Sequence, residues 1–313
     1  MTGTPTEAPR PWAVEEPVDA ARAAALIAAQ VPELAGAEVV PWGQGWDNAA
    51  FLVGGVWVFR FPQRAVAAPL LEREVRALPR VADAVPVRIT APSWVGRPSA
   101  AYPWWFAGYR VVPGATLDRA GLDDAARGTL VPALAAFLRA LHGLDATPFR
   151  EDGVPGDEIG RLDVVARVPQ MLERLDVLGD RVDQAALTAV VRDLEARLRA
   201  SPPALGTDTV VHGDLYSRHL VVADDGALAG VIDWGDLHVG DPAVDLAVAH
   251  LVLPDDARDA FRAAYGGVDE ATWTLARFRA VQHAIATAWY AGEVGDDAFF
   301  VESAAALRRL ARG

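Results

Sequence analysis

The chain has 313 residues, enough for two domains or two lobes with a sizeable core. Its 52% of apolar residues is well above what a disordered chain carries. A net charge of −13, without any basic run, argues against a nucleic-acid partner. The chain has no cysteine and therefore no disulfide, which fits a reducing compartment. No apolar run reaches the ~18 residues of a membrane helix, so we expect a cytoplasmic protein without a membrane partner.

The first 110 residues predict a mostly β lobe that carries one important helix. Residues 1–11 are polar and Pro-rich, and they predict a disordered tail without the features of a signal peptide. The short apolar runs that follow are separated by glycines, which is typical of an antiparallel β-meander. In chain order, the expected elements are a helix over 19–30, strands over 39–42, 49–53 and 56–61, a helix over 70–78 and a strand over 104–112.

The rest of the chain is mostly helical in pattern. Pro113-Gly114 ends the preceding strand, so residues 111–114 predict a hinge between a lobe over 1–110 and a lobe over 115–313. Apolar residues at helical spacing predict helices over 130–144, 162–178, 184–199, 256–265, 270–290 and 297–310.

A predicted β-hairpin in this second lobe brings two aspartates together. Strands over 220–223 and 228–232 flank the tight turn Asp224-Asp225-Gly226, so the chain folds back and places Asp214 near Asp233. Phosphoryl transfer from a nucleotide needs such a pair. One carboxylate orients the attacking hydroxyl or accepts its proton, and the other holds Mg²⁺ on the β- and γ-phosphates.

The motif around these aspartates resembles that of a known family. His212-Gly213-Asp214 with His219 at +5, followed by Ile232-Asp233-Trp234, is similar to the aminoglycoside phosphotransferase family of small-molecule kinases. The run Gly240-Asp241-Pro242-Ala243-Val244-Asp245 resembles the same family. The resemblance implies an α+β, bilobal protein-kinase-like fold, with a small antiparallel β N-lobe that carries one key helix and a larger α-helical C-lobe. With a histidine, His219, five residues after Asp214, the motif is also similar to that of the macrolide phosphotransferase branch.

The resemblance assigns a nucleotide site to the first lobe. Gly43 and Gly45 lie between the first two expected strands, together with Asn48, where a glycine-rich loop lets the backbone approach phosphates closely. The segment that contains Val111 resembles the interlobe linker, whose backbone groups could hydrogen-bond a purine edge. The sequence leaves ATP and GTP open.

An arginine stands where kinases of this kind carry a phosphate-binding cation. All 29 basic residues of the chain are arginines, so Arg60 on the third strand must take the place of the usual lysine. Its expected partner is Glu74, which lies on the apolar face of the following helix, where an unpaired carboxylate is costly. Glu72 is offset from that face by about 200° and is not expected to pair with Arg60.

At the catalytic end, Asp214 is expected to act on the acceptor hydroxyl and Asp233 to bind Mg²⁺. His219 is the second expected metal ligand. Its nitrogen suits Mn²⁺ better than Mg²⁺, so Mn²⁺ is an alternative. Three roles for His219 stay open here: direct ligation, ligation through water, and a hydrogen bond to Asp214.

The other polar residues of this region are interpreted as supports. His212 is expected to brace the catalytic loop by hydrogen bonds to the backbone, Asp241 to cap a helix, and Asp245 to face back toward the loop. Asp236 and His238 are assigned either to the substrate pocket or to the solvent-exposed surface. The remaining histidines are interpreted as core or surface residues rather than ligands: His142, His250 and His283.

The sequence therefore predicts a nucleotide-dependent O-phosphotransferase of a hydroxylated small molecule. The first expectation for the acceptor is an antibiotic, either an aminoglycoside or a macrolide. A metabolite such as an amino alcohol or a sugar is the alternative within this class. A catalytically weak kinase-like module that only binds ligands is the alternative outside it. The oligomeric state is left open.

Overall fold

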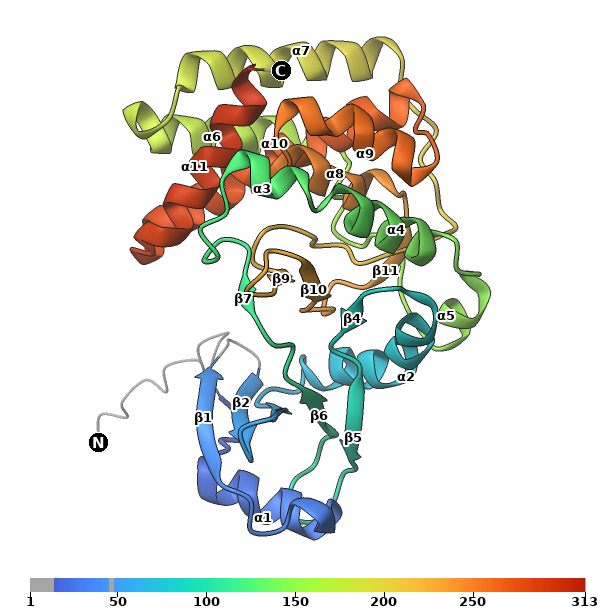
Figure 1. Ribbon diagram of the computed structural model, residues 1–313, viewed down its shortest axis with the longest axis vertical. Helices are drawn as coiled ribbons and strands as arrows, with labels where there is room; N and C mark the ends of the chain where they lie inside the picture. The colour runs from blue at the N-terminus through green and yellow to red at the C-terminus, as the bar shows by residue number, and fades with distance from the viewer. Residues whose placement is uncertain (1–13, 45–47, 313) are drawn as a thin grey trace, which may run out of the picture. The chain divides into compact units, whose positions relative to one another are not determined.

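The computed structural model describes residues 14–44 and 48–312 and divides the chain into two compact units (Figure 1). The first unit takes in the chain up to Pro79 and Thr90–Val111, and the second takes in Arg80–Ile89 and the chain from Val112 onward. The residues expected as a disordered tail, 1–11, lie outside the described part of the chain. Residues 80–89 depart from the expected division because β4 (Arg88–Ile89) pairs in parallel with a strand of the second unit.

The first unit is built on a five-stranded antiparallel sheet, as its glycine-separated apolar runs predict. The strand order is β1-β2-β3-β6-β5. The sequence did not predict one strand of this sheet, β5. Its segment, Pro92-Ser93-Trp94-Val95-Gly96, is short and is bounded by a proline and a glycine. The strands are β1 (Val39–Gln44), β2 (Asn48–Val53), β3 (Trp57–Pro62), β5 (Pro92–Gly96) and β6 (Phe106–Arg110).

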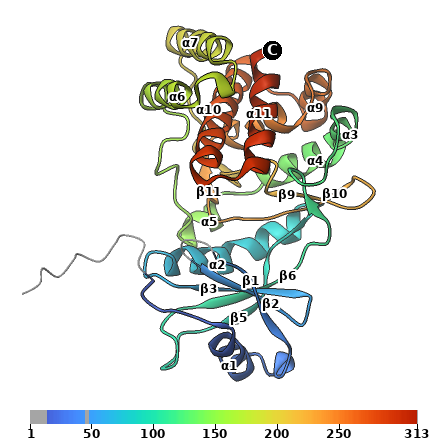
Figure 2. The same cartoon turned by 90° about the vertical axis from the view of Figure 1, so that its left-hand side faces the viewer.

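Helices α1 (Ala20–Gln30) and α2 (Ala68–Ala84) pack on opposite faces of this sheet. Alternation along β6 separates the faces: Phe106 joins the cluster under α1, while Ala107 and Tyr109 pack with Leu71 of α2. Figure 2 shows α1 against the sheet at the N-terminal, dark-blue end of the chain. The α1 face is aromatic and closely packed, since a Cβ on Gly108 would lie 2.5 Å from the Phe59 ring.

Helix α2 is longer than predicted. The predicted helix ended at Leu78, yet the helix runs through Pro79 to Ala84. Ala77, Leu78 and Val81 around the proline are fully buried, and their packing outweighs the hydrogen bond that the proline removes. The boundary between the two units falls within this helix, after Pro79.

The second unit carries a four-stranded sheet in the order β4-β10-β9-β7 and a separate two-stranded pair, β8 with β11. The predicted hairpin is present: β9 pairs antiparallel with β10, and Gly226 takes a positive φ of 82° in the turn. The strands other than β4 are β7 (Ala115–Thr116), β8 (Thr209–Val211), β9 (Leu220–Val222), β10 (Leu228–Val231) and β11 (His238–Gly240).

Helices make up most of the second unit. The long helix α10 packs against α6, α8 and α11 and forms its centre, and every residue of α8 is buried (Figure 2). No helix in the described part of the chain is long and apolar enough to cross a membrane. The helices are α3 (Asp124–Gly128), α4 (Val131–His142), α5 (Thr147–Glu151), α6 (Val164–Leu178), α7 (Gln184–Ala200), α8 (Ala243–Val252), α9 (Arg258–Tyr265), α10 (Glu270–Val294) and α11 (Asp297–Arg312).

Candidate functional site

Asp214 lies in the loop that follows β8, and glycine is required beside it. Gly213 has a φ of +91°, and a Cβ there would lie 2.1 Å from the backbone oxygen of Asp236. The loop that carries Asp214 therefore packs directly on the loop that follows Asp233. Because there is no room between them, the two loops hold each other in place.

Two residues predicted as supports hold this loop by its backbone. The fully buried Asp245 of α8 accepts the N–H groups of His212 at 2.7 Å and Gly213 at 2.9 Å. The His212 side chain donates from Nε2 to the Ile232 carbonyl at 3.0 Å, and its Nδ1 accepts the Asp214 N–H at 3.3 Å. Burial lowers the pKa of His212, which keeps the ring neutral, as these bonds require. The bracing roles expected for both residues are confirmed.

The carboxylate of Asp214 faces two side chains of α10. Its Oδ1 lies 3.5 Å from Nδ1 of His283 and 3.7 Å from the guanidinium of Arg279. Burial raises the pKa of Asp214, while His219 and Arg279 oppose that rise. A carboxylate held in this way keeps a defined orientation and is a better proton acceptor than one in water.

His219 lies between the two aspartates. Its Nδ1 is 2.7 Å from the Asp214 backbone oxygen, which can only accept, so Nδ1 carries the proton. The other nitrogen, Nε2, lies 3.4 Å from Oδ2 of Asp233. Asp233 has a left-handed φ of 64°, the one such non-glycine residue in the described part of the chain. Strained backbone of this kind concentrates at functional sites.

This pair of residues fits a nucleotide-bound metal ion. Within residues 14–44 and 48–312, no group of three or more metal-binding side chains is found. Mg²⁺ commonly takes one or two protein ligands and completes its coordination with phosphates and water. One carboxylate and one imidazole nitrogen meet that requirement.

Arg161 lies in the loop before α6, and its side chain joins three parts of this site. The side chain is 7% exposed and donates from Nε to the Gly213 carbonyl at 3.1 Å. It also pairs with Asp157 at 2.7 Å and with Asp236 in the loop that follows Asp233. Asp236, left open between pocket and surface, is thus a partner of Arg161. An isolated Arg-Leu pair after a glycine carries no sequence signal for such a role.

His283 is a core histidine, one of the two environments expected for it, and is 8% exposed. Its ring also faces Asp214 and packs against Tyr216, with ring centroids 4.7 Å apart. Burial, together with the charge of Arg279, holds the pKa of His283 well below its usual value, so the ring is neutral. A run of polar residues on a buried helix, Arg279, Gln282 and His283, is the signal that could have found it.

In the first unit, Arg60 pairs with the predicted partner. Its Nη1 lies 3.0 and 3.2 Å from the two carboxylate oxygens of Glu74, which is 4% exposed. The Tyr109 hydroxyl donates to the same carboxylate at 3.1 Å. Glu72 instead pairs with Arg76 on the exposed side of α2. The helical phase of α2 therefore correctly chose between the two glutamates.

The remaining residues expected to bind nucleotide are placed less completely. Gly43 belongs to the end of β1, and Asn48 begins β2. Gly45 lies outside the described residues. The Val111 N–H donates to the Val56 carbonyl at 2.9 Å, so this amide is already used within the first unit.

Asp241, expected to cap a helix, differs slightly from that prediction. It precedes the cap position of α8, which Pro242 occupies, and accepts the Ala243 N–H at 2.8 Å.

Comparison with known proteins decides the family. The family model described as "Phosphotransferase enzyme family" matches residues 38–281. The chain belongs to this family. It is a phosphotransferase, and the two aspartates lie in the part that the model covers. A stretch of 48 residues is also 31% identical to the uncharacterized protein YcbJ of Bacillus subtilis, but it spans only 15% of this chain and 16% of that protein.

Solved structures show the same α+β, kinase-like fold. The GDP and kanamycin complex of APH(2")-IIia is 25% identical, with a TM-score of 0.66 over 91% of this chain and 97% of that one. A GDP complex of aminoglycoside 2'-phosphotransferase-IIIa is 23% identical, with a TM-score of 0.68 over 94% and 99%. A macrolide 2'-phosphotransferase from Brachybacterium faecium is 24% identical, with a TM-score of 0.59 over 93% and 98%.

Proposed function

We propose that this phosphotransferase moves the γ-phosphoryl group of ATP or GTP to a hydroxyl group of a small molecule, with an antibiotic as the foremost acceptor. The observation that carries the proposal is the convergence of Asp214 and Asp233 on His219. The Asp214 Oδ2 lies 3.8 Å from Nδ1 of that ring, and the Asp233 Oδ2 lies 3.4 Å from Nε2. The GDP, ADP and antibiotic complexes of structural relatives support both the nucleotide and the acceptor.

In the proposed reaction, Asp214 accepts a hydrogen bond from the acceptor hydroxyl and orients it. The hydroxyl oxygen forms a bond to the γ-phosphorus while the bond from that phosphorus to the β–γ bridging oxygen breaks. The hydroxyl proton passes to the Asp214 carboxylate, and the nucleoside diphosphate leaves. Arg279 and His283 hold the carboxylate from the side of α10, so that it does not rotate away from the acceptor.

The proposed metal ligands are Asp233 and His219. When bound, Mg²⁺ or Mn²⁺ would neutralise charge that builds up on the β- and γ-phosphates. Asp233 would supply an oxygen ligand and His219 a nitrogen from Nε2, because Nδ1 is committed to the Asp214 carbonyl.

The proposed nucleotide residues are those of the first unit. Arg60 would contact phosphates while Glu74 keeps its guanidinium in one orientation, and arginine can do so without any change of protonation. Gly43, Gly45 and Asn48 would form the phosphate loop. At the linker, Val111 would offer its carbonyl alone, since its N–H is bonded to Val56.

Transfer can be tested directly with the purified protein. ATP or GTP is supplied with Mg²⁺ or Mn²⁺ and with kanamycin, gentamicin or erythromycin, and the phosphorylated acceptor is detected by mass spectrometry. We expect an acceptor that gains one phosphoryl group, with an equal amount of nucleoside diphosphate. A protein that binds nucleotide but neither hydrolyses it nor transfers phosphate to these or to amino alcohol and sugar acceptors would instead be a binding module.

A further inference from the structure

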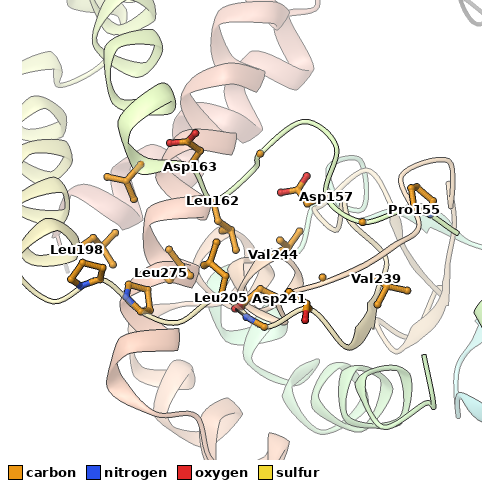
Figure 3. Close-up of a pocket in the computed structure, with 18 of the residues that line it drawn as sticks. Pro155, Asp157, Leu162, Asp163, Leu198, Leu205, Val239, Asp241, Val244 and Leu275 are labelled. Carbon is orange, nitrogen blue, oxygen red and sulfur yellow. Dashed lines mark hydrogen bonds between the residues drawn. The ribbon is translucent and has the colours of Figure 1, made fainter. Parts of the chain in front are cut away.

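The loop between β8 and β9 has an arginine at each end. Arg161 holds its start by donating to the Gly213 carbonyl. The partner of Arg161, Asp157, lies in the wall of a cavity of about 1000 Å³ in the second unit (Figure 3). Arg218 lies at the other end of the loop, immediately before His219. The contacts of Arg218 therefore bear on the position of the proposed metal ligand.

The Arg218 side chain joins three segments that are far apart in the sequence. Its Nε donates to Oδ2 of Asp118, in the segment that follows β7, at 3.2 Å. Its Nη2 donates to Asp296, the residue before α11. The guanidinium carbon lies 3.5 Å from the centre of the Phe299 ring, in the first turn of α11. A guanidinium can make these contacts together, because its donors lie in one plane and its face stacks on aromatic rings.

The ion pair with Asp118 is buried on the side of the carboxylate. The Asp118 side chain is 2% exposed, and its Oδ1 has no hydrogen-bond partner among the described residues. A buried carboxylate without a cation is costly, and breaking such a pair by removing one member is strongly destabilising. Asp118 therefore keeps the Arg218 side chain, and with it the end of the loop, beside β7.

The start of α11 provides the second carboxylate. Asp296 accepts the backbone N–H of Phe299 at 3.1 Å in addition to the guanidinium of Arg218. Its side chain is 33% exposed, so water weakens this ion pair more than the pair with Asp118. Of the two carboxylates, Asp118 is thus the one whose pairing depends most on Arg218.

Arg218 also acts on His219 through neighbouring rings. Phe299, on which the guanidinium stacks, lies 6.0 Å from the ring of Tyr216. The Tyr216 ring in turn lies 4.4 Å from the ring of His219. The His219 N–H donates to the Tyr216 carbonyl at 3.0 Å, so Arg218 is part of the turn that ends at His219. A displaced Arg218 would therefore shift both the backbone and the ring of His219.

We propose that Arg218 is a positioning residue for the phosphotransfer. Its contacts with the segment after β7 and with the start of α11 fix the backbone and ring of His219, so that Nε2 faces Asp233. The inference rests on the proposed function, because it concerns how the proposed metal ligand is held. The alternative is an ion pair that supports folding alone.

The experiment compares Arg218→Met and Arg218→Lys with a matched control, Arg119→Gln. Arg119 follows Asp118 in the sequence, but it is exposed and takes no part in these contacts. Two quantities are measured: kcat for transfer, and the Mn²⁺ affinity of the complex with a non-hydrolysable analogue of ATP or GTP, from the spin resonance signal of free Mn²⁺. Arg218→Met should lower each by about 10–100-fold. Arg218→Lys should recover part of the loss, and Arg119→Gln should change neither quantity.

A double variant, Asp118→Leu with Arg218→Met, separates positioning from support of folding. Apolar residues at both positions leave no buried charge unpaired, so the melting temperature should recover from its value in Arg218→Met. The kcat and the Mn²⁺ affinity should stay low, because the loop still lacks its guanidinium contacts. If Arg218→Met does not fold, the double variant and Arg218→Lys decide between the two roles.

The proposal is overturned if kcat and Mn²⁺ affinity in Arg218→Met equal those of the wild type, or if both recover with the melting temperature in the double variant. Transfer that is lost in Asp214→Asn but unchanged in the Arg218 variants supports the proposed reaction and contradicts the role of Arg218. A wild type that transfers no phosphate contradicts the proposed reaction, and the Mn²⁺ affinities then decide the role of Arg218. A wild type that binds no Mn²⁺ with the nucleotide overturns the positioning of a metal ligand altogether.

Discussion

The carboxylate of Asp245 accepts the backbone N–H of Gly213 at 2.9 Å, and Gly213 immediately precedes Asp214, the proposed catalytic residue. The same carboxylate accepts the N–H of His212 and lies 3.2 Å from Nε2 of His142. Asp245 is fully buried, so these donors replace the water that it would otherwise bind. The position of the catalytic loop therefore depends on one charged group in α8.

Asp245→Asn should lower the free energy of unfolding by about 1.5–3 kcal/mol, the usual range for hydrogen bonds to a charged group. The amide has one acceptor oxygen in place of two, so at least one N–H of the loop loses its partner. Chemical denaturation measures the change. The control is Asp208→Asn, whose carboxylate is 81% exposed and pairs with Arg150 at the surface, where about 0–1 kcal/mol is expected.

The effect of Asp245 should depend on pH. Burial alone would raise its pKa, but the hydrogen bonds from the His142 side chain and from the Gly213 backbone N–H hold the pKa below its ordinary value. A lowered pKa in the folded state means that the stabilisation is complete above the unfolded pKa of about 3.9 and is lost as pH falls below it. The difference in stability between wild type and Asp245→Asn should thus stay constant at neutral pH and shrink in acid. A difference that grows on acidification would contradict this account.

Asp214→Asn should lower kcat by about two to four orders of magnitude and leave nucleotide affinity near normal. The amide can still contact the acceptor hydroxyl but cannot take its proton. Steady-state transfer and equilibrium nucleotide binding measure the two quantities. The control is Asp224→Asn in the exposed hairpin turn, which should change neither. A variant that retains more than about a tenth of wild-type kcat would remove Asp214 from its proposed role.

Glu74→Gln should weaken nucleotide binding, and Glu72→Gln should not. Glu74 holds both Arg60 and the Tyr109 hydroxyl, so a neutral amide frees the guanidinium to move. Glu72 is on the same helix and also pairs with an arginine, Arg76, but that pair is exposed. Equilibrium binding of ATP and GTP compares the two variants. Equal affinity in both would mean that Arg60 does not need its partner to bind phosphate.

Arg161→Gln should lower kcat by up to about 100-fold, the scale expected when a catalytic group is displaced by about 1 Å, with little change in the KM for nucleotide. Arg161→Lys should recover only part of the loss, because a lysine cannot contact Gly213, Asp157 and Asp236 in one plane. Arg150→Gln, which removes an arginine that pairs with the exposed Asp208, is the control. A structural role alone would lower stability equally in both Arg161 variants and leave the activity per folded molecule unchanged.

Local pattern predicted those parts of the site that lie close together in sequence. The hairpin turn brought Asp214 to Asp233, and helical phase separated Glu74 from Glu72. The roles of Arg161, Arg279 and His283 were missed because these side chains reach the loop of Gly213 and Asp214 from α10 and from the loop before α6, and only tertiary packing brings those segments together. The continuation of α2 past Pro79 and the parallel pairing of β4 with β10 were missed for the same reason. Long-range contacts leave no periodic trace in one sequence.

His219→Asn tests whether the imidazole binds the metal ion directly. The Asp214 carbonyl fixes the proton on Nδ1, so the Nε2 lone pair is turned toward Asp233, at 3.4 Å from its Oδ2. Direct ligation by this nitrogen should favour Mn²⁺ over Mg²⁺, and an asparagine oxygen should shift the preference toward Mg²⁺ while activity is retained. If His219 only positions Asp214, kcat should fall with both metals and their ratio should stay the same. The measurement is kcat/KM with Mn²⁺ and with Mg²⁺ for wild type and variant. An unchanged ratio of the Mn²⁺ and Mg²⁺ values of kcat/KM rules out direct ligation, because His219→Asn is the only change in the loop and it replaces a nitrogen donor with an oxygen donor.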